Sequence, residues 1–319
     1  MRQELLDHDS AVPIAGAGGS TTADPPRKFR LSGRAAPYVL SLPALILLCV
    51  FVIAPCLLSV VLAMFDWQIL MGTGQFVGLD NFKRMLTGEE LYRSLRVTIV
   101  YAFYTVPVSV GAGLAVALGI HSLRRGGAFW RAVYFVPTAA TLAAAAAVWR
   151  LLLYPDSGVF DQTVGKLTGT SAWLSSPDLA LGAVALVGNW QGIGFAAVIL
   201  MAGLAGVPRR LYEAAAIDGA GAWHRFVHVT LPAIGPATVL ATMTTTVSSL
   251  KAYDQIAIMT AGGPARSTET LTFLIWRRGI DFLDIGGAAV VNLVLLAVAV
   301  IATIVLGLFG RASLASKEK

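Results

Sequence analysis

Six long apolar stretches alternate with shorter polar segments along the chain. They cover approximately residues 37–65, 94–120, 128–153, 178–204, 231–258 and 287–310. Each is long enough for the roughly 20 residues that an α-helix needs to cross the hydrocarbon core of a bilayer. The stretches are continuous rather than alternating, and only helices or closed barrels satisfy every backbone group in lipid. The pattern therefore predicts an all-α membrane protein with six transmembrane helices.

The segments outside these stretches define the organisation. Residues 1–36 are rich in Pro, Gly, Ser and Ala and have no apolar period, which is typical of a disordered tail. The connections within 37–310 are too short for a separate soluble domain, so this part is expected to form one transmembrane domain. Residues 311–319 form a short C-terminal tail. The fifth stretch is the least certain because it contains many Thr and Ser residues and Lys251.

Composition and charge agree with this organisation. Apolar residues make up 56% of the 319 residues and charged residues 13%, against roughly 25% charged in soluble domains. The mean hydropathy of +0.71 also excludes a disordered chain. With the N-terminus inside, the inner segments hold 13 Lys and Arg residues and the outer segments hold 7. This bias predicts a multi-pass protein of the cell membrane with both termini in the cytoplasm, and it accounts for most of the basic excess without nucleic acid.

The inner segment between the fourth and fifth stretches is more than a plain loop. Its first half, RRLYEAAAI, is a run of helix formers, and Asp218-Gly219 is a turn signal. The following AGAWHRFVHV favours a second short helix. The sequence thus predicts a helix–turn–helix at about 209–229 on the cytoplasmic face.

This segment carries a resemblance to a known family. EAAAIDGAGAWHRFVHVTLP (213–232) resembles the EAA loop of the membrane subunits of bacterial ABC importers. The pattern has Glu-Ala-Ala, a Gly six positions after the Glu, and Leu-Pro at the start of the next span. The matching residues here are Glu213, Ala214, Ala215, Gly219, Leu231 and Pro232, and Asp218 and Ala220 complete the turn. FVGLDNFKRML (76–86) and KAYDQIAIMTAGGPARSTETL (251–271) are similar to segments of the maltose-type permeases, which import carbohydrates and related compounds such as glycerol 3-phosphate.

The resemblance implies a type I ABC importer permease fold and an assembly. Six spans would form half of a translocation path, and a second, related permease subunit would form the other half. Two cytoplasmic ATP-binding subunits would grip the 209–229 element, and an extracytoplasmic substrate-binding protein would deliver the solute. The implied ATPase-coupling interface consists of Glu213, Ala214, Ala215, Asp218, Gly219 and Ala220. No cofactor and no metal are expected.

The residue types of this element fit such a role. The alanines keep the first helix slim, Gly219 is expected to permit a tight turn that a side chain would obstruct, and Glu213 could anchor the helix by charge-assisted hydrogen bonds. The alternative is an ordinary amphipathic helix at the membrane interface. The chain itself has no G-x-x-x-x-G-K-[ST] motif, so we expect a transport subunit that is not an enzyme and has no nucleotide site.

Polar residues within the spans are candidates for the substrate path. Asn189, Trp190 and Gln191 lie near the middle of the fourth stretch, where they could form a sugar-facing wall. Gly188 and Gly192 flank them, so helix–helix packing with amides as interhelical links is the alternative.

Weaker candidates lie on the last two stretches. Asn292 and Tyr253 could contact substrate, although packing is the simpler role for a tyrosine. Lys251 and Asp254 are three residues apart, which favours an ion pair on one helix face over a gate. His224 and His228 have a spacing that could hold a metal, but a solvated or partner-facing surface is favoured because no third ligand beyond Asp218 is near.

The sequence argues against two other functions. An intramembrane serine protease needs a buried Ser–His pair, and none of the four histidines lies deep in a stretch. A self-sufficient secondary transporter would be expected to show an internal repeat, and it would leave the 209–229 element unexplained.

Overall fold

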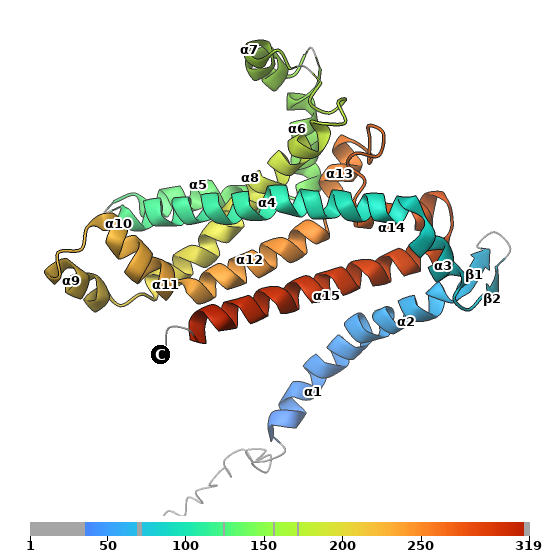
Figure 1. The fold of residues 1–319 in the computed structure, drawn as a ribbon, viewed down its shortest axis with the longest axis horizontal. Coiled ribbons are helices and arrows are strands. Elements are labelled where there is room, and N and C mark those ends of the chain that lie inside the picture. Colours follow the sequence, from blue (N-terminus) through green and yellow to red (C-terminus); the bar gives the residue numbers. More distant parts are fainter. Residues whose placement is uncertain (1–35, 69–71, 124, 156, 171, 316–319) are drawn as a thin grey trace, which may run out of the picture. The chain divides into compact units, whose positions relative to one another are not determined.

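The computed structural model describes residues 36–315 except 69–71, 124, 156 and 171, and these residues are mostly helical (Figure 1). The tail expected at 1–36 lies outside the described residues apart from Ala36, as do residues 316–319. The chain divides into two units, Met1–Val52 and Ile53–Lys319.

The first unit contains helix α1 (Ala36–Leu48) and most of the π-helical turn η1 (Cys49–Ile53). This segment is apolar on all sides, and its side chains from Leu40 to Val52 are exposed. Exposed apolar side chains around a whole helix fit contact with lipid rather than water. The helical segment Leu40–Ala63, which includes α2 (Ala54–Ala63), is long and apolar enough to cross a bilayer.

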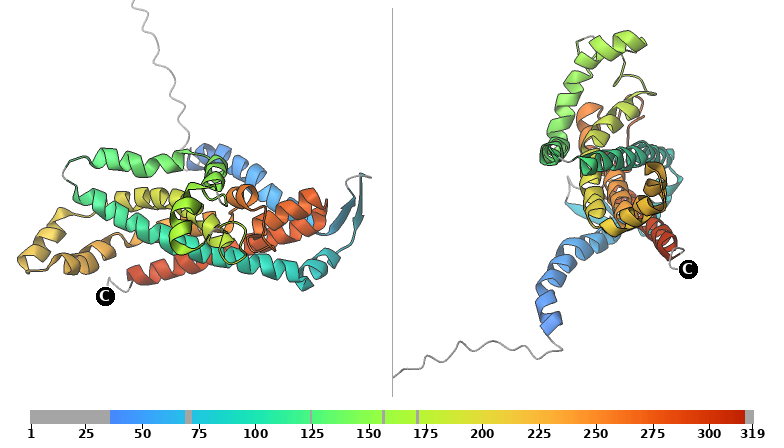
Figure 2. Two further views of the ribbon diagram at one scale, coloured as in Figure 1. Left: turned by 90° about the horizontal axis from the view of Figure 1, so that it is seen from above. Right: turned by 90° about the vertical axis from the view of Figure 1, so that its left-hand side faces the viewer.

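The second unit is built around long helices that pack along one another (Figures 1 and 2). α4 packs against α8 and α12, and α12 also packs against α15, which contacts α2. The bounds of the four helices not yet given are Glu89–Ser122 for α4, Ala180–Ala205 for α8, Gly235–Leu250 for α12 and Ile285–Ala315 for α15. α4 begins five residues before the expected stretch, and α15 continues five residues past 310.

Small residues bring α4 and α8 close together. A Cβ on Gly192 would lie 2.6 Å from Ser109 Oγ, and a Cβ on Gly188 would overlap the Tyr101 hydroxyl. A Cβ on Gly113 of α4 would lie 2.9 Å from the Cβ of Ala196. The glycines at 188 and 192 therefore serve helix packing, as membrane helices commonly use small residues.

The number of straight spans differs from the prediction. Among the described residues, four helices are long and apolar enough to cross a bilayer: Leu40–Ala63, Glu89–Ser122, Ala180–Ala205 and Ile285–Gly310. Two further pairs qualify only if a bent pair counts as one span. These are α5 (Gly127–Ala139) with α6 (Leu142–Leu152), bent by 94°, and Ala222–Ala233 with α12, bent by 68°.

The third stretch is broken because two residues leave the helical conformation. Ala140 has φ −76° and ψ 143°, and Thr141 has φ −66° and ψ 139°. Thr141 starts α6 as its N-cap, since its Oγ1 accepts a hydrogen bond from the Ala144 amide at 3.3 Å. An N-capping threonine inside an apolar run marks the break.

The fifth stretch also ends earlier than expected. α12 stops at Leu250, and α13 (Asp254–Met259) is a separate helix that packs against α6. The expectation that Lys251 and Asp254 share a helix face is wrong, because the residues between them are not helical. Neither forms an ion pair within the described ranges.

The two ends of the second unit carry different short elements (Figure 1). One end holds α9 (Arg209–Ile217) and a second helical segment made of α10 (Ala222–Arg225), the π-helical turn η4 (Phe226–Thr230) and α11 (Leu231–Ala233). Helix formation at 209–217 is thus confirmed, and the second helix runs four residues beyond the expected 229.

The opposite end contains structure that the sequence did not predict. An antiparallel β-hairpin pairs Phe65 with Phe76, and the short helix α3 follows the hairpin. The elements on this side are β1 (Phe65–Gln68), β2 (Thr73–Phe76), α3 (Asp80–Thr87), α14 (Leu271–Trp276) and the π-helical turn η5 (Arg277–Asp281). The connection between α6 and α8 holds two further short elements, η3 (Asp161–Gly165) and α7 (Lys166–Thr168).

We expect Gly188→Ala to destabilise the α4–α8 contact by about 1–3 kcal/mol, because the added methyl overlaps Tyr101 Oη. Gly182→Ala is the matched control on the same helix, since a Cβ there meets nothing within 4 Å. Thermal unfolding in detergent should show a lower Tm for the first variant and an unchanged or higher Tm for the second. Equal Tm values for the two variants would contradict the packing role.

Candidate functional site

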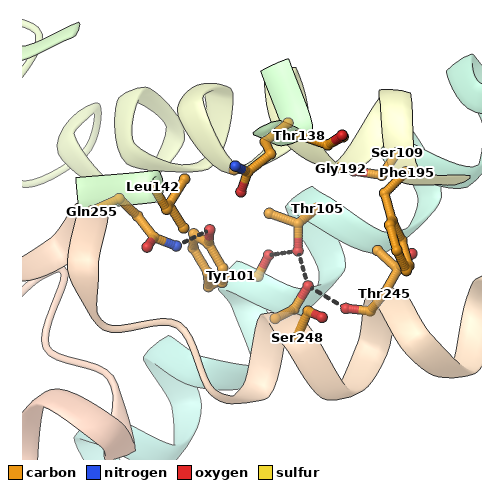
Figure 3. Close-up of a pocket in the computed structure, with 13 residues that line it drawn as sticks. Tyr101, Thr105, Ser109, Thr138, Leu142, Gly192, Phe195, Thr245, Ser248 and Gln255 are labelled. Atoms are coloured by element: carbon orange, nitrogen blue, oxygen red, sulfur yellow. Dashed lines mark hydrogen bonds between the residues drawn. The ribbon is translucent and has the colours of Figure 1, made fainter. Parts of the chain in front are cut away.

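A cavity of about 260 Å³ lies among α4, α5, α8, α12 and α13 (Figure 3). Its size is slightly below the range of about 300–1,000 Å³ that is usual for small-molecule sites. Hydroxyl, amide, aromatic and small side chains line it, and none of the lining side chains is charged. The lining residues are Tyr101, Thr105, Ser109, Thr138, Leu142, Gly188, Gln191, Gly192, Phe195, Thr245, Ser248, Ser249 and Gln255.

Hydrogen bonds hold the polar wall of the cavity in place. Gln255 Nε2 donates to Tyr101 Oη at 2.7 Å, which ties α13 to α4 (Figure 3). Thr105 Oγ1 and Ser249 Oγ are 2.6 Å apart and tie α4 to α12. Gln255 Oε1 is buried and has no hydrogen-bond partner in the described part of the chain. A buried acceptor of this kind is suited to a hydroxyl group of a bound solute or of water.

Gln191 is the predicted candidate that reaches this cavity. Its Nε2 donates to the carbonyl oxygens of Pro137 at 3.2 Å and Ala140 at 2.9 Å. Those carbonyls lie at the end of α5, where the break leaves them without an amide donor in the same helix. The side chain therefore has a structural task, which is to stabilise the break between α5 and α6.

Asn189 and Trp190 lie on the same helix but do not line the cavity. Asn189 Oδ1 accepts from Ser109 Oγ at 2.9 Å, and its Nδ2 donates to the Tyr104 carbonyl at 3.2 Å. Trp190 packs edge-on against Trp149 of α6, with ring centroids 6.1 Å apart. These contacts link α8 to α4 and α6.

Tyr253 and Asn292 lie elsewhere, so the five predicted path residues are not brought together. The ring of Tyr253 stacks on Phe273 at 6.2 Å. Asn292 Nδ2 donates to Ser59 Oγ at 3.1 Å and so links α15 to α2. A direct role for either residue in transport stays a prediction.

Most of the residues that line the cavity were not predicted, although the sequence contains a signal for them. Tyr101, Thr105 and Ser109 recur every four residues on α4, and Thr245 and Ser249 do so on α12. This spacing places polar groups on one face of an otherwise apolar helix, which is the face expected to avoid lipid.

The other predicted site is the turn at the end of α9. The Ala220 amide donates to the Ala215 carbonyl at 2.9 Å, and the Gly219 amide donates to the Ala216 carbonyl at 3.1 Å. This pair of bonds is a Schellman motif, with Gly219 at C′ and φ +73°. The expected reason for the glycine needs correction: a Cβ there would meet nothing within 4 Å, so backbone conformation and not obstruction demands glycine.

The surface of α9 is available to a partner. Glu213, Ala214 and Asp218 are exposed, and Glu213 forms no ion pair or hydrogen bond within the described ranges. Tyr212 Oη lies 3.1 Å from Thr230 Oγ1, which fastens α9 to the following helical segment. His224 and His228 stack with ring centroids 4.0 Å apart. Among the described residues, no group of three His, Cys, Asp or Glu could hold a metal ion.

Charged residues form a cluster at the opposite end. Arg277 and Arg278 both pair with Glu90 at the start of α4, and Arg277 Nη1 donates to Glu269 Oε2 at 2.6 Å. Burial raises the pKa of Glu269 above its ordinary value, and Arg266 opposes that rise. Arg278 also pairs with Asp284 at 3.3 Å. The cluster fastens the start of α4 to η5 and, through Asp284, to the residue that precedes α15.

Comparison with known proteins identifies the family of the chain. Residues 85–315 match the family model described as the binding-protein-dependent transport system inner membrane component. The chain belongs to this family. It is therefore a multi-pass ABC importer permease, which confirms the resemblance seen in the EAA loop.

Relatives of this permease support the carbohydrate branch of the family. It is 32% identical over 239 residues to the trehalose/maltose transport system permease protein MalF of Thermococcus litoralis, covering 74% of this chain and 81% of that one. It is 30% identical over 286 residues to the sulfoquinovosyl glycerol transport system permease protein SmoG of Agrobacterium fabrum, covering 88% and 91%.

A solved structure shares the fold of the permease. One chain of a bacterial ABC transporter involved in the import of the acidic polysaccharide alginate superposes with a TM-score of 0.73. The match covers 87% of this permease and 95% of that chain at 19% sequence identity. At this identity the likeness shows the permease fold alone.

We expect Gln191→Leu to lower the Tm, because the part-buried Pro137 carbonyl and the exposed Ala140 carbonyl lose their donor and a hydrogen bond contributes about 0.5–1.5 kcal/mol. Ser248→Ala is the control, since Ser248 lines the same cavity without a hydrogen bond among the described residues. Thermal unfolding of both variants in detergent is the measurement. A Gln191→Leu protein as stable as Ser248→Ala would show that the amide does not stabilise the break.

Proposed function

We propose that this permease forms half of an ATP-driven import path for a neutral carbohydrate and that α9 couples it to its ATPases. The observation that carries the coupling role is the exposed end of α9, closed by a Schellman motif and presenting Glu213 without a partner in the described chain. The family match over 85–315 adds weight, because it includes this element.

The proposed assembly contains a second, related permease, two cytoplasmic ATP-binding subunits and an extracytoplasmic substrate-binding protein. α9 faces the cytoplasm in this arrangement, as do both termini, in agreement with the bias of 13 inner to 7 outer Lys and Arg residues. Glu213, Asp218 and the small side chains of Ala214, Ala215 and Ala220 form the interface with an ATPase subunit. A slim helix end with two carboxylates fits a groove that has complementary cations.

The coupling step is a displacement of α9. Closure of the ATPases on ATP moves the α9 turn, and α8, which ends four residues before α9, moves with it. The α4, α8 and α12 walls of the cavity then exchange an inward opening for an outward one. Hydrolysis and release reverse the displacement.

The substrate follows from the chemistry of the cavity wall. Hydroxyl and amide groups from Tyr101, Thr105, Ser248 and Gln255 exchange hydrogen bonds with sugar hydroxyls, and Phe195 offers an apolar face. No lining side chain carries a charge, so an anion there would lose its hydration without gaining a counterion, which is strongly unfavourable. A neutral saccharide, of the kind named for the trehalose/maltose relative, is favoured over a phosphate or sulfonate ester.

Coupling is tested by changing Gly219. Gly219→Val forces a β-branched residue to φ +73°, which is outside its allowed region and costs at least about 1–2 kcal/mol locally. We expect normal membrane insertion but loss of uptake and of ATPase co-purification. Uptake of labelled solute and a pull-down of the tagged chain measure these outcomes.

Two matched variants separate turn geometry from bulk. Gly221→Val introduces the same side chain two residues away, where the backbone has φ −67° and a Cβ also meets nothing within 4 Å. Gly219→Asn keeps a residue that tolerates positive φ. Both should retain uptake, and a Gly219→Val protein that transports normally would refute the coupling role.

The substrate class is tested on the whole transporter with its binding protein. Neutral disaccharides should stimulate ATP hydrolysis, whereas sn-glycerol 3-phosphate should not. Ser248→Ala should raise the half-saturating concentration of the saccharide about 2–10-fold, because it removes one hydrogen bond worth about 0.5–1.5 kcal/mol. The Tm of this variant should be unchanged. Stimulation by the phosphate ester alone would exclude a neutral substrate.

A further inference from the structure

A second concavity, of about 510 Å³, opens between the end of α4, the start of α5 and the end of α8. Its walls are apolar and are formed mainly by Phe135, Val198 and Met201. Its polar members are Arg131 and His121. The groove shares no residue with the cavity of the proposed substrate path.

Arg131 is a cation without a counterion. It forms no ion pair and no side-chain hydrogen bond with the residues that the structure describes, and no carboxylate lines the groove. A guanidinium beside an apolar wall is best stabilised by an anion that accepts its hydrogen bonds, and a phosphate matches its geometry.

Aromatic side chains place this end of α5 at the depth of the lipid headgroups. Phe129, Trp130 and Tyr134 form a row of contacting rings: Phe129 meets Trp130 edge-on at 5.6 Å between centroids, and Trp130 meets Tyr134 at 6.3 Å in a tilted arrangement. Trp130 is 44% exposed and Tyr134 38% exposed, beside Arg131 on the same helix end. Exposed Trp and Tyr at the end of an apolar helix mark the membrane–water interface.

We propose that this groove binds an anionic phospholipid. The phosphate lies against Arg131, and an acyl chain lies along Phe135, Val198 and Met201. Charge complementarity and interfacial depth together favour a lipid over a soluble anion, because only a lipid satisfies the guanidinium and covers the apolar wall at once. The groove lies at the same end of the helix bundle as α9, because His121 also lines a neighbouring pocket together with Tyr212 of α9 and Trp223 of α10. Only the assignment to the cytoplasmic leaflet rests on the proposed function.

The test is lipid retention by the purified transporter complex. The complex is exchanged into equal amounts of phosphatidylglycerol and phosphatidylcholine, and bound lipids are counted by native mass spectrometry. Arg131→Gln should lower phosphatidylglycerol retention at one site about fivefold, because one basic residue near a membrane surface contributes about 1 kcal/mol to the binding of anionic lipid. Arg131→Lys keeps the charge and should restore most of it.

Arg96→Gln is the matched control, because Arg96 is an exposed arginine near the other end of α4 that forms no ion pair with the described residues. It should leave retention unchanged. Val198→Trp fills the apolar part of the groove and should lower retention of both lipids. Each variant is first checked for an unchanged Tm.

Three results would overturn the proposal. Equal phosphatidylglycerol retention by Arg131→Gln and Arg96→Gln would show that Arg131 does not contact the lipid headgroup. Displacement by inorganic phosphate, with no loss in Val198→Trp, would indicate a soluble anion. Disulfide cross-linking of an Ala202→Cys permease to its partner, with lipid retention unchanged, would mean that protein covers the groove. The Gly219→Val permease separates the two proposals, because it should lose uptake and its ATPases while the permease itself keeps the lipid.

Discussion

The structure depends on one requirement, that every backbone carbonyl in the apolar interior must find a donor. Continuous helices meet it by themselves, but α5 ends inside the bundle at Ala139 and α12 ends there at Leu250. At the first break, Gln191 donates to the two freed carbonyls of α5. At the second, Thr270 Oγ1 donates to the Ala252 carbonyl at 2.9 Å and Thr272 Oγ1 to the Leu250 carbonyl at 3.3 Å.

The breaks create the space of the cavity. If α12 continued straight through Lys251, α13 could not turn to bring Gln255 against Tyr101. If α5 ran on through Ala140, Thr138 and Leu142 would not lie on either side of a bend at the cavity. Polar side chains at the breaks and close α4–α8 packing therefore produce a small polar chamber within a mostly apolar bundle.

The sequence predicted features that depend on local period and composition. The helices at 94–120 and 178–204, the helix at 209–217 and the turn at Gly219 were all found from such patterns. It did not predict the breaks, since Ala140 and Thr141 differ little in composition from their neighbours and the capping by Gln191 is tertiary. The cavity was missed for a similar reason. Its hydroxyl groups are spread over α4, α5 and α12, at positions far apart in the sequence. The contiguous triplet at 189–191 is easier to see in the sequence, but its side chains contact three different neighbours.

Gln191 has a mechanical consequence. It stands on α8 about 21 Å from the end of that helix at Ala205, taking 1.5 Å per residue over 14 residues. Because its amide is bonded to carbonyls at the break between α5 and α6, α8 is held against that break at one point. α9 follows beyond the C-terminal end of α8. Under the proposed coupling, a displacement of α9 would reach the chamber through α8 without deforming a helix. The two hydrogen bonds from Gln191 to the residues between α5 and α6 would have to follow that displacement.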